Sequence, residues 1–415
     1  MVPEGWKKDQ IGNHVELLSG YPFKSENYLE SGVEGIRLLR GDNIGQNFLR
    51  WRDAKHWPAK ETEGLERYQL RKGDFVIAMD RTWISAGLKV AEVTDDDIPS
   101  LLVQRVSRLR AKKTLEQGLL RQIFSSHRFQ QYVKSVQTET AVPHISAQQI
   151  KEFTFLAPPE WEGRKIAQIL TTWDKAIEKT EQLIQNSNSL KNALMRRLLS
   201  GEKRLTDFDD HWKQYTLSEL GSTYGGLTSK TKDDFGTGEP FIPYKNVFLN
   251  SRIDTKSLDH VKIREDENQA TVAYGDVLFT TSSETPDEVG MSSVLLDNLD
   301  NLYLNSFCFG YRLNDFSILS PRFARYLLRG NHFRRAMFRL AQGSTRYNIS
   351  KADVLKIRIS LPSIEEQEAI SDVLDECTNL REKESEYLSR LRAEKTALAQ
   401  QLLTGKRRVP LSKEA

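Results

Sequence analysis

Cysteine and clustered histidine are scarce in this chain of 415 residues. Its two cysteines, Cys308 and Cys377, cannot form a disulfide framework, and neither belongs to a Cys-x-x-Cys pair. The seven histidines are scattered, with no His-Glu-x-x-His motif and no spacing typical of zinc ligands. The sequence therefore predicts no metal site, and we interpret an isolated histidine as a surface or packed residue.

Long apolar runs are also absent. No segment approaches the roughly 18 consecutive apolar residues of a membrane span, and residues 1–4 show no signal-peptide pattern. Hydrophobic residues make up 38% of the chain and charged residues 28%, as in globular proteins. We therefore expect a cytoplasmic protein without a membrane partner. The net charge of +3 says little about nucleic acid, so any basic surface must come from local clustering.

Motifs for catalysis are missing as well. The chain has no Asn-Pro-Pro-aromatic or Asp-Pro-Pro-aromatic motif for amino-group methylation and no GxxxxGK[ST] loop for ATP. Pro286-Asp287 is the one fragment that resembles part of a nuclease motif, but no Glu-x-Lys follows it. We therefore predict a protein that is not an enzyme and binds no cofactor itself.

An internal repeat is the strongest positive feature. Residues 158–204 align without a gap with residues 362–408, at a constant offset of 204 residues (408 − 204 = 204). The matched residues are Pro158, Glu162, Ile166, Leu170, Lys191, Leu198, Gly201 and Arg204 with Pro362, Glu366, Ile370, Leu374, Lys395, Leu402, Gly405 and Arg408. Looser matches upstream include Trp6-Lys7 with Trp212-Lys213 and Gly73-Asp74 with Gly275-Asp276. The chain is thus a tandem duplication.

Each repeat consists of a variable domain followed by a long helix. We predict variable domains at 1–158 and 206–362, a central helical region at 159–205, and a C-terminal helical region with a tail at 363–415. Prolines precede both predicted helices, and Gly201 and Gly405 follow them. A helix of about 38 residues would be roughly 57 Å long.

Apolar residues in both helices follow three- and four-residue steps, as in a narrow coiled-coil seam. They are Ile166, Leu170, Trp173, Ile177, Ile184 and Leu198 in the first helix and Ile370, Leu374, Cys377, Leu391, Leu398 and Leu402 in the second. We expect an α+β protein with two mixed α/β domains in tandem. The two helices would pair as an antiparallel coiled coil, giving a rod with pseudo-twofold symmetry. The alternative is that each helix packs on its own domain.

Within the variable domains, two strand-then-loop segments occupy corresponding places, at 36–44 and 241–247. Both combine an asparagine with a cation, Arg40 with Asn43 and Lys245 with Asn246. Asparagine and arginine are the side chains that contact adenine and guanine edges in pairs of hydrogen bonds, so these residues are candidates for contacting DNA. The alternative is a turn asparagine beside a solvated charge.

A second group of candidates lies on basic or polar segments. Arg325, Arg329 and Arg335 recur at helical spacing, which would place them on one helix face suited to phosphate contact; a basic face that is merely solvated is the alternative. The segments 73–80 and 275–281 each predict a strand after a Gly-Asp turn. Loops near strand ends add the candidates Arg81, Trp83, Thr345 and Arg346.

These features resemble the specificity subunit (S, or HsdS) of Type I restriction-modification systems. The resemblance covers essentially the whole chain and is most specific in the helix endings "LLSGEKRL" and "LLTGKRRV". The segments "GYPFKSENY", "GDFVIAM" and "GSTRYNIS" also look like that family's patterns. Lys24 in the first of these, and Lys230 in the corresponding segment "GSTYGGLTSKTKDDF", join the candidates for DNA contact. The two corresponding segments differ, so reading positions do not transfer directly between the domains.

The resemblance implies a definite arrangement of partners. Two target-recognition domains would bind the halves of a split, asymmetric site in double-stranded DNA, and the helices would set their spacing and dock two methylation (M) subunits. Those subunits would carry S-adenosylmethionine and methylate adenine N6, while a restriction (R) subunit, if present, would use ATP and Mg. A stand-alone architectural DNA-binding protein and a helical adaptor without a DNA role are the alternatives.

Overall fold

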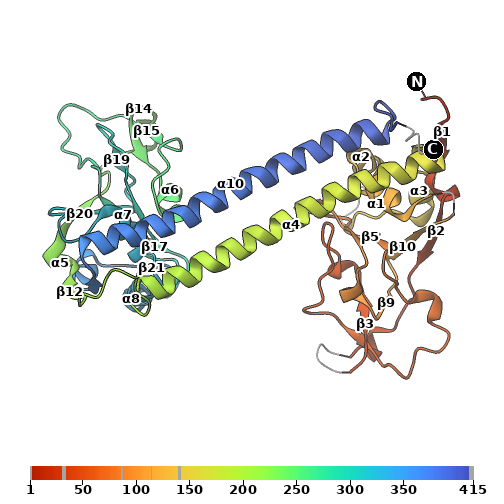
Figure 1. Ribbon diagram of the computed structural model, residues 1–415, viewed down its shortest axis with the longest axis horizontal. Helices are drawn as coiled ribbons and strands as arrows, with labels where there is room; N and C mark the ends of the chain where they lie inside the picture. Colours follow the sequence, from red (N-terminus) through yellow and green to blue (C-terminus); the bar gives the residue numbers. More distant parts are fainter. Residues whose placement is uncertain (1, 30–33, 86, 114, 139–141, 411–415) are drawn as a thin grey trace. The chain divides into compact units, whose positions relative to one another are not determined.

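The computed structural model describes residues 2–29, 34–85, 87–113, 115–138 and 142–410. The chain divides into two compact units, one of residues 1–181 with 386–415 and the other of residues 182–385. We call them unit 1 and unit 2. Each unit contains one variable domain together with one half of each of the two longest helices, which Figure 1 shows as the yellow-green and blue ribbons.

The centre of unit 1 is a four-stranded antiparallel sheet in the order β2-β10-β5-β8. All residues of its strand β5 (Phe75–Ala78) are buried, as the apolar run after the Gly-Asp turn predicts. Phe75 and Ile77 belong to one core, whereas Val76 and Ala78 belong to another. Alternate side chains of a strand face opposite sides of its sheet, so this sheet is covered on both faces.

Helices cover one face of that sheet, and a smaller sheet with its loops covers the other. Leu119 and Phe124 of α1 and Phe129 of α2 pack with Phe75. Leu39 of β3 and Leu102 of β9 belong to the core on the opposite face. The remaining bounds are α1 (Gln117–Ser125), α2 (His127–Val136), α3 (Ala147–Glu152), β1 (Lys7–Gln10), β2 (Val15–Ser19), β3 (Ile36–Leu39), β4 (His56–Trp57), β6 (Trp83–Ile84), β7 (Gly87–Leu88), β8 (Val90–Glu92), β9 (Ser100–Leu102), β10 (Val106–Ala111) and β11 (Thr154–Ala157).

Unit 2 repeats this plan. Its central sheet has the order β13-β20-β16-β18, and the fully buried strand β16 (Val277–Thr280) takes the place of β5. The prediction of two mixed α/β domains in tandem is therefore confirmed. The other bounds are β12 (Lys213–Thr216), β13 (Gly221–Gly225), β14 (Phe235–Ile242), β15 (Asp259–Val261), β17 (Ser282–Ser283), β18 (Ser292–Val294), β19 (Tyr303–Leu304), β20 (Cys308–Leu313), β21 (Tyr347–Asn348), β22 (Arg358–Leu361), α5 (Leu217–Leu220), α6 (Tyr244–Leu249), α7 (Pro321–Leu327), α8 (Asn331–Leu340) and α9 (Lys351–Val354).

The two predicted long helices are present as α4 (Glu160–Leu198) and α10 (Ile364–Leu403). Both are followed by a glycine with positive φ, +72° at Gly201 and +67° at Gly405. That left-handed conformation ends a helix and is strained for any residue with a Cβ atom. In the part of the chain that the structure describes, no helix is long and apolar enough to cross a membrane.

Within each unit, α4 and α10 run antiparallel. In unit 1, Lys395 Nζ donates to Asp174 at 2.5 Å, and Arg392 lies 2.5 Å from Glu181. The residue number rises along α4 from the first pair to the second and falls along α10, so the two helices have opposite directions. In unit 2, Leu198 near the end of α4 packs with Ile370 and Leu374 near the start of α10.

Unit 1 also contradicts the alternative that each helix packs only on its own domain. Leu402 of α10 shares a core with Ile166 and Leu170 of α4 and with the first variable domain. Seven predicted seam residues are buried (Ile166, Leu170, Leu198, Ile370, Leu374, Leu391 and Leu402), and five are partly exposed (Trp173, Ile177, Ile184, Cys377 and Leu398).

A buried carboxylate in unit 1 joins the start of α4 to the segment after α10. Glu162 at the start of α4 is fully buried and accepts two hydrogen bonds of 2.8 Å from the Arg408 guanidinium beyond α10. The Trp6 indole donates a third bond at 2.8 Å, and the Val409 backbone N–H donates a fourth at 3.3 Å. Burial opposes the charge of Glu162, but these donors outweigh it and lower its pKa.

Unit 2 contains the matching group. The Arg204 guanidinium beyond α4 donates two hydrogen bonds, of 2.5 and 2.7 Å, to the buried carboxylate of Glu366 in α10. Its guanidinium carbon lies 5.9 Å from the centre of the Trp212 ring. Glu162 and Arg204 come from one repeat and Glu366 and Arg408 from the other. The buried ion pair of each unit therefore joins residues of both repeats.

Candidate nucleic-acid interface

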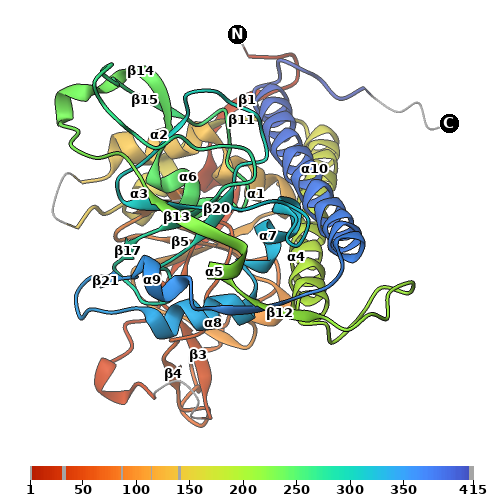
Figure 2. The ribbon, with the colours of Figure 1, turned by 90° about the vertical axis from the view of Figure 1, so that its left-hand side faces the viewer.

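In unit 2, several loops meet where the central sheet ends. The short strands β17 and β21 pair antiparallel, and this pairing brings the loop containing Thr345 and Arg346 beside Ser283. Together with Tyr244 and Phe307, these residues line a pocket of about 590 Å³, which we call loop cluster 2. In Figure 2, β17 and β21 lie at the edge of unit 2 away from α4 and α10.

Loop cluster 2 offers both hydrogen-bonding groups and an accessible ring. The Phe307 side chain is 55% exposed, and the Arg346 guanidinium lies 5.7 Å from its ring centre. Glu284 is exposed at the rim, and the Ser283 hydroxyl donates to Glu288 at 3.1 Å. Arginine, hydroxyl and carboxylate groups are the side chains that contact base edges in the DNA grooves. The arrangement is therefore suited to reading bases.

Unit 1 has a cluster in the corresponding place, which we call loop cluster 1 and define as Asp80, Arg81, Trp83, Arg105 and His144. Asp80 forms a bridge to His144, as Ser282 of β17 pairs with Asn348 of β21 in unit 2. The Asp80 carboxylate lies 2.8 Å from Arg105 and 2.5 Å from Nδ1 of His144. Residues 139–141 of the adjoining loop lie outside the described residues.

Loop cluster 1 combines a strained backbone with exposed charge. Arg81 and Arg105 have φ angles of +45° and +66°, a strained conformation that is concentrated at functional sites. The Arg81 side chain is exposed, and the Trp83 indole is held by a 3.0 Å bond to Gln137. The two clusters thus occupy equivalent positions, but cluster 1 is built mainly of charged groups and cluster 2 mainly of neutral and aromatic groups.

Both predicted asparagines have other roles. Asn43 is buried; its side-chain oxygen accepts from the Arg40 backbone N–H, and its amide donates to Arg50 O, both at 3.0 Å. Asn246 is buried too, and its amide donates to Asp254 O and Ser257 O. These amides hold their own loops, as the alternative of a turn asparagine states, so we do not retain them as DNA contacts.

The predicted lysines differ in accessibility. We do not retain Lys230 as a DNA contact, because its side chain is only 4% exposed and is bound to Glu267 and to Lys262 O. Lys24 is exposed, with its nearest carboxylate at 3.9 Å, and Lys245 is exposed on α6. Arg40 is partly exposed and lies 3.4 Å from Asp42. A DNA contact by Lys24, Lys245 or Arg40 stays a prediction.

The three predicted arginines do not form one basic helix face. α7 ends at Leu327 and α8 begins at Asn331, so Arg325, Arg329 and Arg335 do not share one helix. A Cβ atom at the intervening Gly330 would lie 3.1 Å from Leu327 O, and this tight turn redirects the chain. The sequence spacing was compatible with one helix, and the glycine was the signal against it.

The three arginines consequently have different environments. Arg329 donates to the carbonyls of Ser292, Val247 and Phe248, and burial, with Arg334 and Arg325 nearby, lowers its pKa to about 10. Arg325 donates to Asp375 at 2.9 Å. Arg335 is exposed, and no partner for it is found among the described residues.

We expect Arg329→Ala to lower the free energy of unfolding by roughly 2–3 kcal/mol, because it leaves buried carbonyl groups without donors. Arg335→Ala should change it by less than about 0.5 kcal/mol. Urea denaturation of both variants measures the difference. Equal stabilities would contradict the structural role of Arg329.

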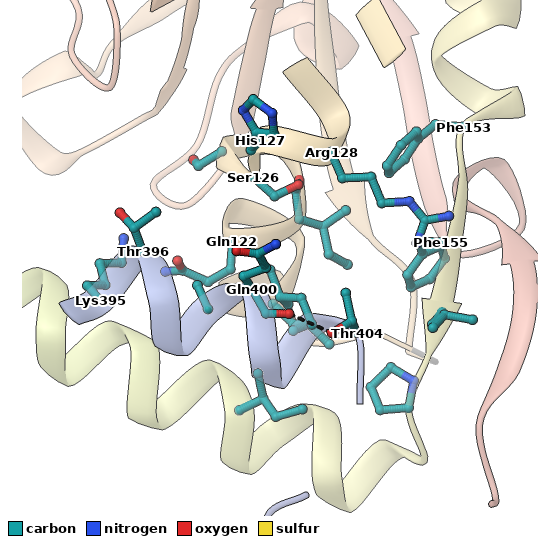
Figure 3. Close-up of a pocket in the computed structure, with 18 of the residues that line it drawn as sticks. Gln122, Ser126, His127, Arg128, Phe153, Phe155, Lys395, Thr396, Gln400 and Thr404 are labelled. Atoms are coloured by element: carbon teal, nitrogen blue, oxygen red, sulfur yellow. Dashed lines mark hydrogen bonds between the residues drawn. The ribbon is translucent and has the colours of Figure 1, made fainter. Parts of the chain in front are cut away.

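A further pocket lies in unit 1, between α1, β11 and the pair α4 and α10 (Figure 3). It has a volume of about 320 Å³ and an apolar floor that includes Leu119, Phe153 and Phe155. Its polar rim, labelled in Figure 3, includes Gln122, Arg128 and Lys395. Neither an aspartate nor a glutamate lines it, and the described residues contain no group of three or more potential metal ligands. The pocket does not have the paired groups of an acid–base site.

Comparison with known proteins agrees with this duplicated architecture. The family described as Type I restriction modification DNA specificity domain matches twice, at residues 3–186 and 209–390. This chain belongs to that family. The two matches correspond to the two repeats, and the resemblance inferred from the helix endings is confirmed.

Several members of the specificity-domain family are similar to the chain. The EcoAI specificity subunit of Escherichia coli is 34% identical over 193 residues, which cover 46% of this chain and only 30% of that protein. The EcoKI specificity subunit of E. coli K12 is 22% identical over 89% of this chain and 81% of its own length. The crystal structure of a Type I S subunit from M. genitalium has a TM-score of 0.58 at 14% identity and covers 97% of this chain and 96% of its own, which shows a shared fold.

Proposed function

We propose that this protein is the DNA-specificity subunit of a Type I restriction-modification complex and reads a bipartite, asymmetric target. The observation that carries the proposal is the pair of loop clusters, which occupy equivalent positions in two duplicated units but differ in chemistry. Cluster 1 presents an Asp–Arg–His group and cluster 2 presents hydroxyl, carboxylate, arginine and aromatic groups. Different side chains at equivalent positions of the two units would select different half-sites of the DNA.

In this proposal the chain itself carries out no chemistry. Two M subunits that carry S-adenosylmethionine dock on the helical regions and methylate adenine N6, and an R subunit, where present, supplies ATP- and Mg-dependent cleavage. Membership of the specificity-domain family supports these partners. Because the target is chromosomal or invading DNA, we also propose that the complex works in the cytoplasm.

The test is co-expression with a Type I methylation (M) subunit from the same genome, followed by genome-wide sequencing that detects N6-methyladenine. We expect methylation confined to one split, asymmetric motif, and its loss when this chain is omitted. A chain with residues 206–362 taken from another family member should change one half of the motif only. Methylation that persists unchanged without this chain would contradict the proposal. Tight DNA binding by the chain alone, with no effect on methylation, would favour the architectural alternative.

A further inference from the structure

A wide crevice in unit 2 has an unusual charge balance. It has a volume of about 1130 Å³ and lies between the helices α4 and α10 and the segment 249–256. Seven lysine or arginine residues line it, against four aspartate or glutamate residues. An excess of cations in a polar crevice is the arrangement that attracts an anionic ligand.

Four of the seven cations donate to carboxylates or backbone carbonyls (Arg252, Arg325, Arg329 and Arg334), and Lys256 is exposed to solvent. The other two are partly buried and less well paired. The ammonium of Lys191 on α4 has no hydrogen bond or ion pair among the described residues, and it lies 5.7 Å from the centre of the Tyr326 ring. The Nε atom of Arg381 on α10 is buried without a hydrogen-bond acceptor, and its guanidinium lies 3.8 Å from Glu382. Both side chains line the same crevice.

The internal repeat shows why Lys191 has no ion pair. Lys191 corresponds to Lys395 of unit 1, which is on the pocket rim in Figure 3 and is paired with Asp174 at 2.5 Å. At the place of Asp174, unit 2 has Thr378, whose hydroxyl donates to Leu374 O within its own helix at 2.8 Å. Relative to unit 1, therefore, a carboxylate has been removed beside the lysine.

A cation has also been added. Arg381 takes the place that Ile177 has in unit 1, at the same offset of 204 residues (381 − 177 = 204). Burial, with Arg381 and Arg325 nearby, lowers the pKa of Lys191. A half-buried cation without an ion pair destabilises a fold. Lys191 is such a cation and Arg381 beside it has only the 3.8 Å contact with Glu382, so the crevice is suited to receiving a counter-charge from outside the chain.

We propose that this crevice binds a phosphate group, with Lys191 and Arg381 as its principal contacts. The seven cations of the crevice outnumber its four carboxylates, and this excess suits the two negative charges of a phosphate better than the single charge of a carboxylate. Arginine supplies paired N–H donors for phosphate oxygens, and lysine supplies a point charge. The phosphate belongs either to a DNA backbone, in which case the site extends the proposed function, or to a free ligand such as a nucleotide.

The matched test exploits the repeat. Thr378→Asp installs the carboxylate that unit 1 has in this place and should neutralise Lys191. Thr378→Asn is the control of similar shape without a charge. Lys191→Met removes the cation directly and keeps the test decisive if Thr378→Asp folds poorly. The full chain is titrated with inorganic phosphate and, at equal ionic strength, with chloride and with acetate, while binding is measured by calorimetry and by the thermal unfolding midpoint.

We expect phosphate to bind and to raise the unfolding midpoint of the wild type and of Thr378→Asn more than chloride or acetate does. Binding should weaken at least tenfold in Thr378→Asp and in Lys191→Met. Equal phosphate responses in wild type and Lys191→Met would overturn the proposal. An acetate response as large as the phosphate response would also overturn it and would indicate a carboxylate of a partner protein.

A second experiment identifies the source of the phosphate. If it belongs to the DNA backbone, Thr378→Asp should reduce the slope of log K against log salt for duplex DNA by about one unit. An unchanged slope, together with lost phosphate binding, assigns the site to a free phosphate-bearing ligand. Phosphate binding is measured without DNA or partner subunits, so its failure is distinguishable from failure of the proposed specificity function.

Discussion

Glu162→Ala is expected to lower the free energy of unfolding of unit 1 by about 3 kcal/mol. The Glu162 carboxylate is fully buried and accepts hydrogen bonds from Arg408, from the Trp6 indole and from the Val409 backbone N–H. Its removal leaves these donors without their acceptor and separates the C-terminal segment from the start of α4. Hydrogen-exchange mass spectrometry in urea measures the loss of protection in unit 1 separately from unit 2.

Glu160→Ala is the control for this variant. Glu160 precedes Glu162 by two residues in the same helix, but it is exposed and has only a surface ion pair with Arg164 at 3.1 Å. We expect a change within about 0.5 kcal/mol. Equal losses from Glu160→Ala and Glu162→Ala would contradict the role assigned to the buried group, as would an equal loss of protection in unit 2.

The Glu162 carboxylate also predicts how the stability of the chain falls at acidic pH. The pKa of Glu162 in the folded chain is lower than its ordinary value of 4.5. Its contribution is therefore fully present above that ordinary value and is lost as the pH falls through the folded pKa. In Glu162→Gln, unfolding midpoints measured from pH 6 down to pH 3 should fall less steeply than in the wild type.

Arg346→Ala is expected to weaken recognition of one half of the DNA target by about tenfold to a hundredfold, while the other half stays unchanged. Arg346 is exposed in loop cluster 2 beside Phe307, where its guanidinium is available to a base edge. Loss of one base contact costs roughly 1–3 kcal/mol of discrimination. The methylated motif of the assembled complex, read by sequencing, should become degenerate at positions within a single half-site.

Two further variants sharpen this prediction. Arg81→Ala in loop cluster 1 should relax the opposite half-site. Arg358→Ala, an exposed arginine on β22 outside both clusters, should leave the motif unchanged. A uniform loss of affinity across all sequences in Arg346→Ala, with a shallower salt dependence, would instead make this residue a phosphate contact.

The two clusters were only partly predictable. Arg81, Trp83, Thr345 and Arg346 follow from the expectation that polar residues near strand ends form binding loops. Their partners could not be predicted, because Asp80 meets Arg105 and His144 only through the pairing of distant segments. For the same reason, residue type alone could not separate an exposed Arg335 from an Arg329 buried against carbonyl groups.

The sequence by itself determined the duplication, the long helices and the family, since a constant offset and helical periodicity are properties of local order along the chain. Only the tertiary structure decided which charges are compensated. Glu162 meets Arg408, and Lys191 lies beside Thr378 rather than an aspartate, through contacts between residues far apart in the chain. Charge compensation depends on distance and burial in the folded state, and neither quantity is encoded by the spacing of residues within a segment.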